Sequence, residues 1–213
     1  LLSICRRARV AGADGREERE PAVPDRDVII QNLRDIGMLE DAELELAETA
    51  LLLGALDRPK VDLLPYRQHL AEIAAATRGV TDRTDSVEMQ AETLRNVMAE
   101  RFGYLGDREN YEDLRNANLI DVIDRRKGLP VALGILYLHA GRAYGADMSG
   151  LSFPSHFLIR LSARGQRLIL DPFHGGPRMG AEDLRQLLKQ LLGAGEEIKP
   201  SHYMGVNNRD ILI

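Results

Sequence analysis

Two side chains in the last third of the sequence have the types and spacing of a general base and the carboxylate that orients it. His156 lies in "FPSHFLIRL" and Asp171 in "LILDPFHGG". If Arg164 and Gly165 form a two-residue hairpin loop, both side chains fall on one face of a sheet at diagonal range, whereas a three-residue loop could separate them. Such a carboxylate fixes the tautomer of the imidazole and favours its cation. The plainer interpretation, a satisfied core histidine and a turn aspartate, stays open on spacing alone.

The segment before His156 predicts a buried helix that begins with a proline. In "RRKGLPVALGILYLHAGRAYG", Pro130 suits a first helical turn, where its missing N–H leaves no hydrogen bond unmade. Apolar residues occupy every side of the following helix, which indicates burial. At the start of this helix, Pro130 and Val131 carry no nucleophile. The only sulfhydryl in the sequence is that of Cys5, so a serine or water remains as the alternative nucleophile.

The other candidate binding residues are Asn116, Asn118, Arg126 and His174. The two asparagines precede the buried helix, where their plainer role is to cap a helix and bridge loop backbone. Arg126 belongs to a basic cluster that would equally stabilise a helix C-terminus. His174 could join the His–Asp pair as a metal ligand, but no tight histidine spacing supports such a site. We therefore predict no metal and no cofactor.

Apolar spacing divides the chain into a helical half and a mixed half. The predicted helices include residues 38–56, 66–77, 85–98 and 181–192. Asp85 and Glu88 form a capping pair for the third of these. After Gly145 the period becomes that of strands, and "LSFPSHFLIRLSARGQRLILDPF" predicts two strands joined in a hairpin. Helices followed by a buried central helix packed on a small antiparallel sheet define an α+β fold.

Composition excludes several classes of function. The net charge of -5 over 213 residues argues against nucleic-acid and anionic-membrane partners. No apolar run approaches the roughly 18 residues of a membrane span. The single cysteine allows no intrachain disulfide and no cysteine-based metal site, and it fits a reducing compartment. We therefore expect a cytoplasmic protein.

Three ordered motifs resemble the SirB family of transglutaminase-like proteins. They are "NYEDLRNANLIDVIDRRKGLPVALGILYLHAGRAYG", "FPSHFLIRL" and "LILDPFHGG", and the resemblance covers roughly residues 66–192. It implies a papain-like core of the cysteine-proteinase type, in which a Cys opens the central helix and a His and an Asp follow on successive strands. His156 and Asp171 match the last two positions, while the Cys position is lost. The resemblance also implies that Asn116 and Asn118 help shape the cleft, and that "NNRDILI" begins a tetratricopeptide-like tail.

These observations predict four parts and a function. Residues 1–24 are predicted to be a disordered tail, 25–80 an N-terminal helical segment, 81–195 the transglutaminase-like core, and 196–213 the start of a truncated C-terminal helical tail. Because the His–Asp pair lacks a thiol, we expect a non-catalytic, regulatory module that binds a peptide or protein partner. The alternative is a hydrolase or amidase that uses His156 and Asp171 with a serine or water.

Overall fold

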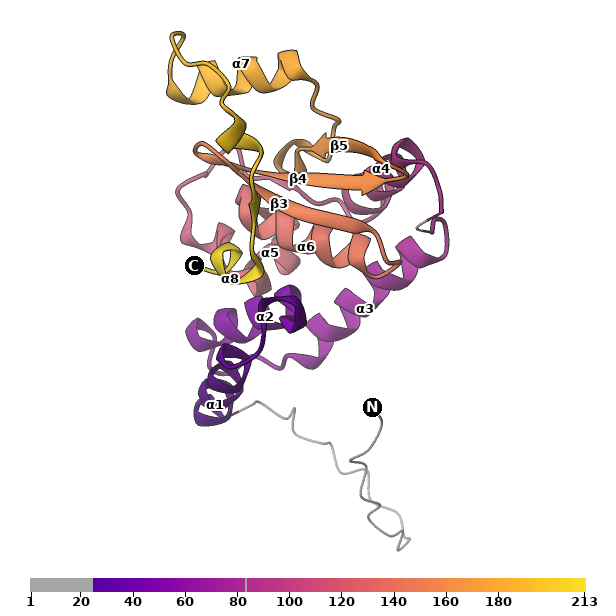
Figure 1. The fold of residues 1–213 in the computed structure, drawn as a ribbon. Helices are drawn as coiled ribbons and strands as arrows, with labels where there is room; N and C mark the ends of the chain where they lie inside the picture. The colour runs from indigo at the N-terminus through magenta and orange to yellow at the C-terminus, as the bar shows by residue number, and fades with distance from the viewer. Residues whose placement is uncertain (1–24, 83) are drawn as a thin grey trace, which may run out of the picture.

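The computed structural model describes residues 25–82 and 84–213, so the predicted tail at 1–24, with Cys5, lies outside the described residues. The elements are arranged in layers (Figure 1). The N-terminal helices lie at one end, and the central helix α6 (Pro130–Arg142) packs against one face of a four-stranded sheet. Helix α7 (Ala181–Leu192) covers the other face of that sheet. This arrangement confirms the predicted α+β class.

The helical half consists of three helices and a short 3-10 turn. These are α1 (Arg26–Gly37), the turn at Asp41–Glu43, α2 (Leu46–Asp57) and α3 (Leu64–Arg78). The prediction of a continuous helix over residues 38–56 was therefore wrong at its start, because α2 begins at Leu46. The backbone N–H of Glu40 donates to the Glu43 carboxylate and closes the turn, and Leu44 and Glu45 are extended before α2 begins.

Helix α4 (Val87–Arg95) continues into a π-helical turn over Asn96–Arg101. Its N-cap is Ser86, whose hydroxyl accepts the backbone N–H of Met89 at 3.2 Å. The predicted cap at Asp85 was one residue early. The Asp85 carboxylate instead accepts the Thr81 hydroxyl and the backbone N–H of Asp82, and so holds the preceding loop.

The central helix begins where the sequence predicts, with Pro130 in its first turn. Before it come β1 (Leu105–Gly106), α5 (Leu119–Arg125) and β2 (Lys127–Gly128). Arg126 ends α5 in the left-handed region at φ 58°. Gly128 then pairs with Gly106 in a parallel ladder. Within the described residues, no helix has both the length and the apolar character that crossing a membrane requires.

The sheet has the strand order β5-β4-β3-β6, and every neighbouring pair is antiparallel. Its strands are β3 (Asp147–Phe153), β4 (His156–Ala163), β5 (Gln166–Leu170) and β6 (Gly205–Val206). The two-residue loop at Arg164 and Gly165 is confirmed. The prediction of two strands was wrong, because Ser155, at φ 54°, turns the chain sharply and separates β3 from β4.

The two faces of the sheet bury different clusters. Phe157 and Ile159 of β4 belong to the large core around α6, while Leu158 belongs to a second cluster with Leu184 and Leu188 of α7. Side chains alternate between faces along a strand. Odd-numbered residues of β4 therefore face α6, and even-numbered residues face α7.

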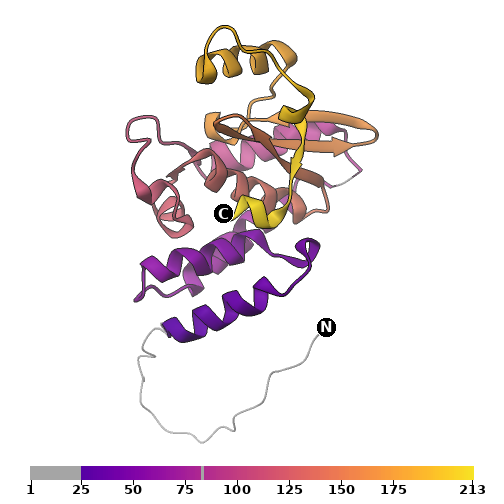
Figure 2. The same ribbon diagram turned by 60° about the vertical axis from the view of Figure 1, so that its left-hand side comes forward.

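Residues 196–213 return to the body of the protein. Strand β6 pairs with β3, and helix α8 (Asn208–Ile211) follows it against the helical half (Figure 2). Asp41 binds this segment, because its carboxylate accepts the backbone N–H groups of Asn208 and Arg209, each at 3.0 Å. Ile211 is buried in the main core.

Candidate functional site

His156 and Asp171 lie side by side, as the hairpin register predicts. His156 is the first residue of β4, and Asp171 follows β5 and caps a 3-10 turn over Pro172–His174. The His156 Nε2 and the Asp171 Oδ1 are 3.0 Å apart. The Asp171 side chain is 1% exposed and that of His156 is 6% exposed. The sequence therefore brings together a buried imidazole and a buried carboxylate.

His174 joins the pair through the second oxygen of the same carboxylate. Its Nδ1 is 2.7 Å from Asp171 Oδ2. The turn that places it ends in Gly175 and Gly176, both in the left-handed region at φ 85° and 79°, which glycine adopts without strain. Gly176 donates its backbone N–H to the Asp171 carbonyl at 2.8 Å. The His174 side chain is 37% exposed, so it is the member of the group that solvent reaches.

The charge of Asp171 fixes the protons on both rings. Burial on its own raises the pKa of Asp171, but hydrogen bonds from His156 and His174 outweigh burial and hold this pKa below the ordinary value. An ionised carboxylate can only accept hydrogen bonds. His156 therefore donates from Nε2 and His174 from Nδ1. Asp171 also accepts the backbone N–H of Phe173 at 3.0 Å.

The pair lies on the sheet face that α7 covers. His156 is directly opposite Phe153, which belongs to the α7 cluster. Its side chain points to the opposite face of the sheet from that of its neighbour Phe157. The Phe157 ring points toward α6, where a Cβ on Gly134 would overlap it. Likewise, the Asp171 side chain points away from the face that its neighbour Leu170 shares with the α6 core. The face on which α6 packs is therefore occupied by apolar rings at this point.

The start of α6 offers no reactive atom to the pair. Pro130 is buried, and Val131 lines a separate, mostly apolar cavity of about 430 Å³ with residues 211–213. Phe173 packs on Gly106, and Gly106 pairs with Gly128, two residues before Pro130. The Phe173 ring also meets the His156 ring edge-on, with the ring centroids 5.9 Å apart. Among the described residues, the only side chain that hydrogen-bonds to His156 is Asp171.

A cavity of about 280 Å³ borders the exposed side of this group. Asp171 and His174 line one wall, and Arg178 and the α7 side chains Gln186 and Gln190 line others. Arg178, Gln186 and Gln190 were not among the predicted site residues. The spacing of Gln186 and Gln190, four residues apart, was the available signal, because it places two amides on one helix face.

The structure places the other three predicted binding residues away from this cavity. Asn116 is fully buried and bridges loop backbone, donating to the Asn110 carbonyl at 2.7 Å. Asn118 caps α5 and donates to the Gly54 carbonyl at 3.0 Å. Arg126 contacts His69 and Tyr104 beside a different cavity. All three make contacts that stabilise the fold, and His174 is the one that adjoins the His–Asp pair.

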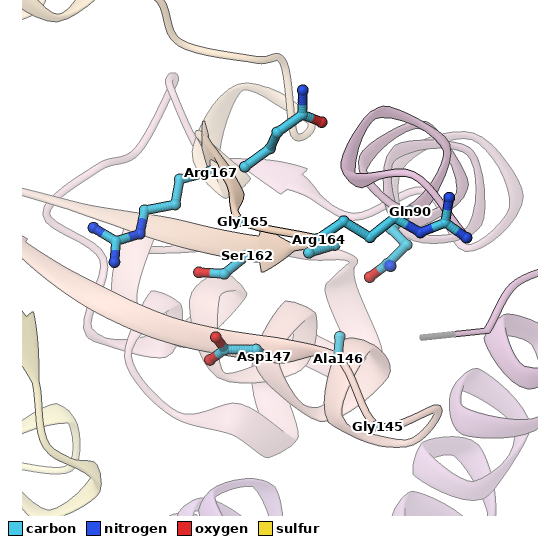
Figure 3. A pocket seen from close by; sticks show the side chains of 10 residues that line it. Gln90, Gly145, Ala146, Asp147, Ser162, Arg164, Gly165 and Arg167 are labelled. Carbon is cyan, nitrogen blue, oxygen red and sulfur yellow. The ribbon is translucent and has the colours of Figure 1, made fainter. Parts of the chain in front are cut away.

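A larger cavity, of about 620 Å³, lies at the β4–β5 hairpin and holds no part of the pair. Figure 3 shows Arg164 and Arg167 extending from the hairpin to opposite sides, with Ser162 and Asp147 on the strands below. The Arg164 guanidinium donates a hydrogen bond to the Thr84 carbonyl. Because its cationic groups diverge, this cavity presents no convergent set of reacting groups, and we place the candidate site at His156, Asp171 and His174.

The fold agrees with what comparison with known proteins finds. The family model of the transglutaminase-like superfamily matches residues 65–213, and the chain belongs to that superfamily. A UPF0162 protein of Vibrio cholerae is 34% identical over 170 residues, which are 79% of this chain and 63% of the relative. A UPF0162 protein of Xylella fastidiosa is 30% identical over 158 residues, or 74% and 56%. These relatives confirm the resemblance to the SirB family.

The match also extends to a larger protein of a different kind. Mouse F-box only protein 21 is 27% identical over 137 residues, which are 59% of this chain but 21% of that protein. The chain also spans less than two thirds of the two UPF0162 relatives above. No solved structure matches the chain significantly.

Proposed function

We propose that this chain is a transglutaminase-like module without a catalytic thiol that binds a peptide or protein partner and has a regulatory role. The observation that carries the proposal is the start of α6. Leu129 precedes this helix, and Pro130 and Val131 occupy its first turn. The family resemblance assigns the nucleophile to this position, and none of these three residues can form a covalent intermediate.

The cavity beside His174 supports binding of a peptide. Its polar walls combine a guanidinium, Arg178, with the amides of Gln186 and Gln190. These groups donate to and accept from peptide backbone and carboxylates. The mouse relative carries the matched segment as about a fifth of its length, as expected of a module that recurs in different proteins. The net charge of -5 favours a protein or peptide over nucleic acid or membrane, and the single cysteine is the basis for proposing a cytoplasmic location.

Peptide selection on the purified chain tests this proposal. We expect displayed peptides to be enriched, and the Arg178→Ala variant to bind a selected peptide roughly tenfold more weakly, as loss of a charge-assisted hydrogen bond predicts. Arg185→Ala is the matched control, because Arg185 lies on α7 but does not line the cavity. Equal binding by both variants would count against this cavity as the binding surface.

The competing function is a hydrolase or amidase, which the intact hydrogen bond between His156 and Asp171 favours. A screen with peptide, amide and ester substrates separates the two functions. We expect no turnover above background, and no difference between the wild type and His156→Ala. Turnover that the His156→Ala variant loses would establish an enzyme and refute the non-catalytic module.

A further inference from the structure

We propose that His156, Asp171 and His174 form a binding site for one Zn²⁺ ion. A ring nitrogen from each histidine and a carboxylate oxygen of Asp171 all lie within 4.8 Å of one another. Two imidazoles and a carboxylate, with one position left open, are a ligand set that zinc accepts. The test of this proposal does not depend on a partner, because the experiment measures metal binding directly.

The present distances are close to those of a coordination sphere. Zinc bonds to histidine nitrogen and carboxylate oxygen are about 2.0–2.2 Å long, so two ligand atoms in a tetrahedral site lie roughly 3.3 Å apart. Here His156 Nε2 is 3.0 Å from Asp171 Oδ1, and His174 Nδ1 is 2.7 Å from Oδ2 of the same carboxylate. Small side-chain movements would therefore convert hydrogen bonds into metal bonds, once each ring proton has moved to its other nitrogen. Each ring stays neutral in this shift, and its ligating nitrogen becomes unprotonated, as metal binding requires.

The surroundings hold the ligands in place. Asp171 is anchored by the Phe173 N–H, which would serve as a second-shell donor to the coordinating carboxylate. His156 is fixed at the start of a strand, and His174 on a turn that Gly175 and Gly176 close. A buried carboxylate between two imidazoles is thus already ordered before any ion arrives.

The ion has a route to the site and a place for a fourth ligand. His174 is partly exposed, and Asp171 and His174 open onto the cavity of about 280 Å³. The charged side chains that line this cavity are Asp171, Asp183 and Arg178, with a net charge of -1. That balance favours a cation. The open coordination position would face the cavity and could hold water or a carboxylate from a partner.

Metal titration of the chain, without a polyhistidine tag and with Cys5 replaced by Ser, tests the proposal. The Cys5→Ser change removes the only thiol, which would otherwise compete for zinc. We expect one Co²⁺ per chain, with visible absorption of a four-coordinate ion that added Zn²⁺ abolishes. His174→Ala and His156→Ala should each weaken Zn²⁺ binding, measured by calorimetry, by roughly tenfold or more.

His202→Ala is the matched control, because His202 lies in a different 3-10 turn, outside this cluster. It should bind Zn²⁺ as tightly as the parent chain. Circular dichroism checks that His174→Ala, a change at a partly exposed position, leaves the fold intact. Absence of stoichiometric binding, equal weakening by His202→Ala, or unchanged binding by His174→Ala would each overturn the proposal. The peptide selection described above would be unaffected by that result.

Discussion

Replacing Asp171 with Ala should lower the free energy of unfolding by about 3 kcal/mol, because it removes the acceptor for three donors. Two of those donors, the His156 ring and the Phe173 backbone N–H, are buried, and a buried donor left without a partner costs about 1–3 kcal/mol. The His174 ring is partly exposed, so water can replace the lost acceptor of its N–H. Relief of the buried charge offsets part of the loss.

Urea unfolding followed by circular dichroism measures this change. For a chain of this size a loss of about 3 kcal/mol also lowers Tm by roughly 6–12 °C. A double-mutant cycle with His156→Ala should give a coupling energy of about 1–3 kcal/mol, because the two residues share one hydrogen bond. Glu182→Ala, at an exposed position on α7, should change stability by less than about 0.5 kcal/mol. A loss below about 1 kcal/mol for Asp171→Ala, or additive effects with His156→Ala, would refute the reasoning.

Three further predictions concern pH and packing. The folded state lowers the pKa of Asp171, so its contribution to stability is complete above the unfolded value of about 3.9 and is lost as the pH falls through the folded pKa. Urea titrations at about pH 6 and pH 3 should therefore show a smaller loss for Asp171→Asn than for the wild type. Gly134→Ala should destabilise by about 1–3 kcal/mol in the same assay because its Cβ would overlap the Phe157 ring, whereas Gly195→Ala, with open space around it, should not. Tyr137→Phe should leave thermal stability unchanged or raise it, because the buried Tyr137 hydroxyl has no hydrogen-bond partner among the described residues; a clear drop in Tm would show that this hydroxyl has a partner.

Local signals in the sequence were sufficient for much of the fold. Pro130 marks the start of α6, and α7 spans the predicted residues 181–192. The hairpin at Arg164 and Gly165 fixes the register, and the register brings His156 to Asp171. In each of these cases neighbouring residues determine the structure, so periodicity and turn chemistry suffice.

Features that depend on distant residues could not be predicted in the same way. Ser155 occupies the left-handed region without being a glycine, so the break between β3 and β4 had no strong local signal. Strand β6 forms only because β3 offers it an edge more than fifty residues earlier in the chain. The sheet face that His156 occupies follows from the packing of α6 and α7 on opposite sides, which no single segment encodes.

The late position of β6 has a consequence for biosynthesis. On the ribosome, β3, β4 and β5 emerge before Gly205 and Val206 do, and they can pair in that interval. Until then the outer edge of β3 presents unpaired N–H and C=O groups, which can pair with strands of other nascent chains. The carboxylate of Asp41, made early, then holds the arriving residues 208 and 209. Rapid docking of residues 205–211 should limit the time in which nascent chains can aggregate through this edge.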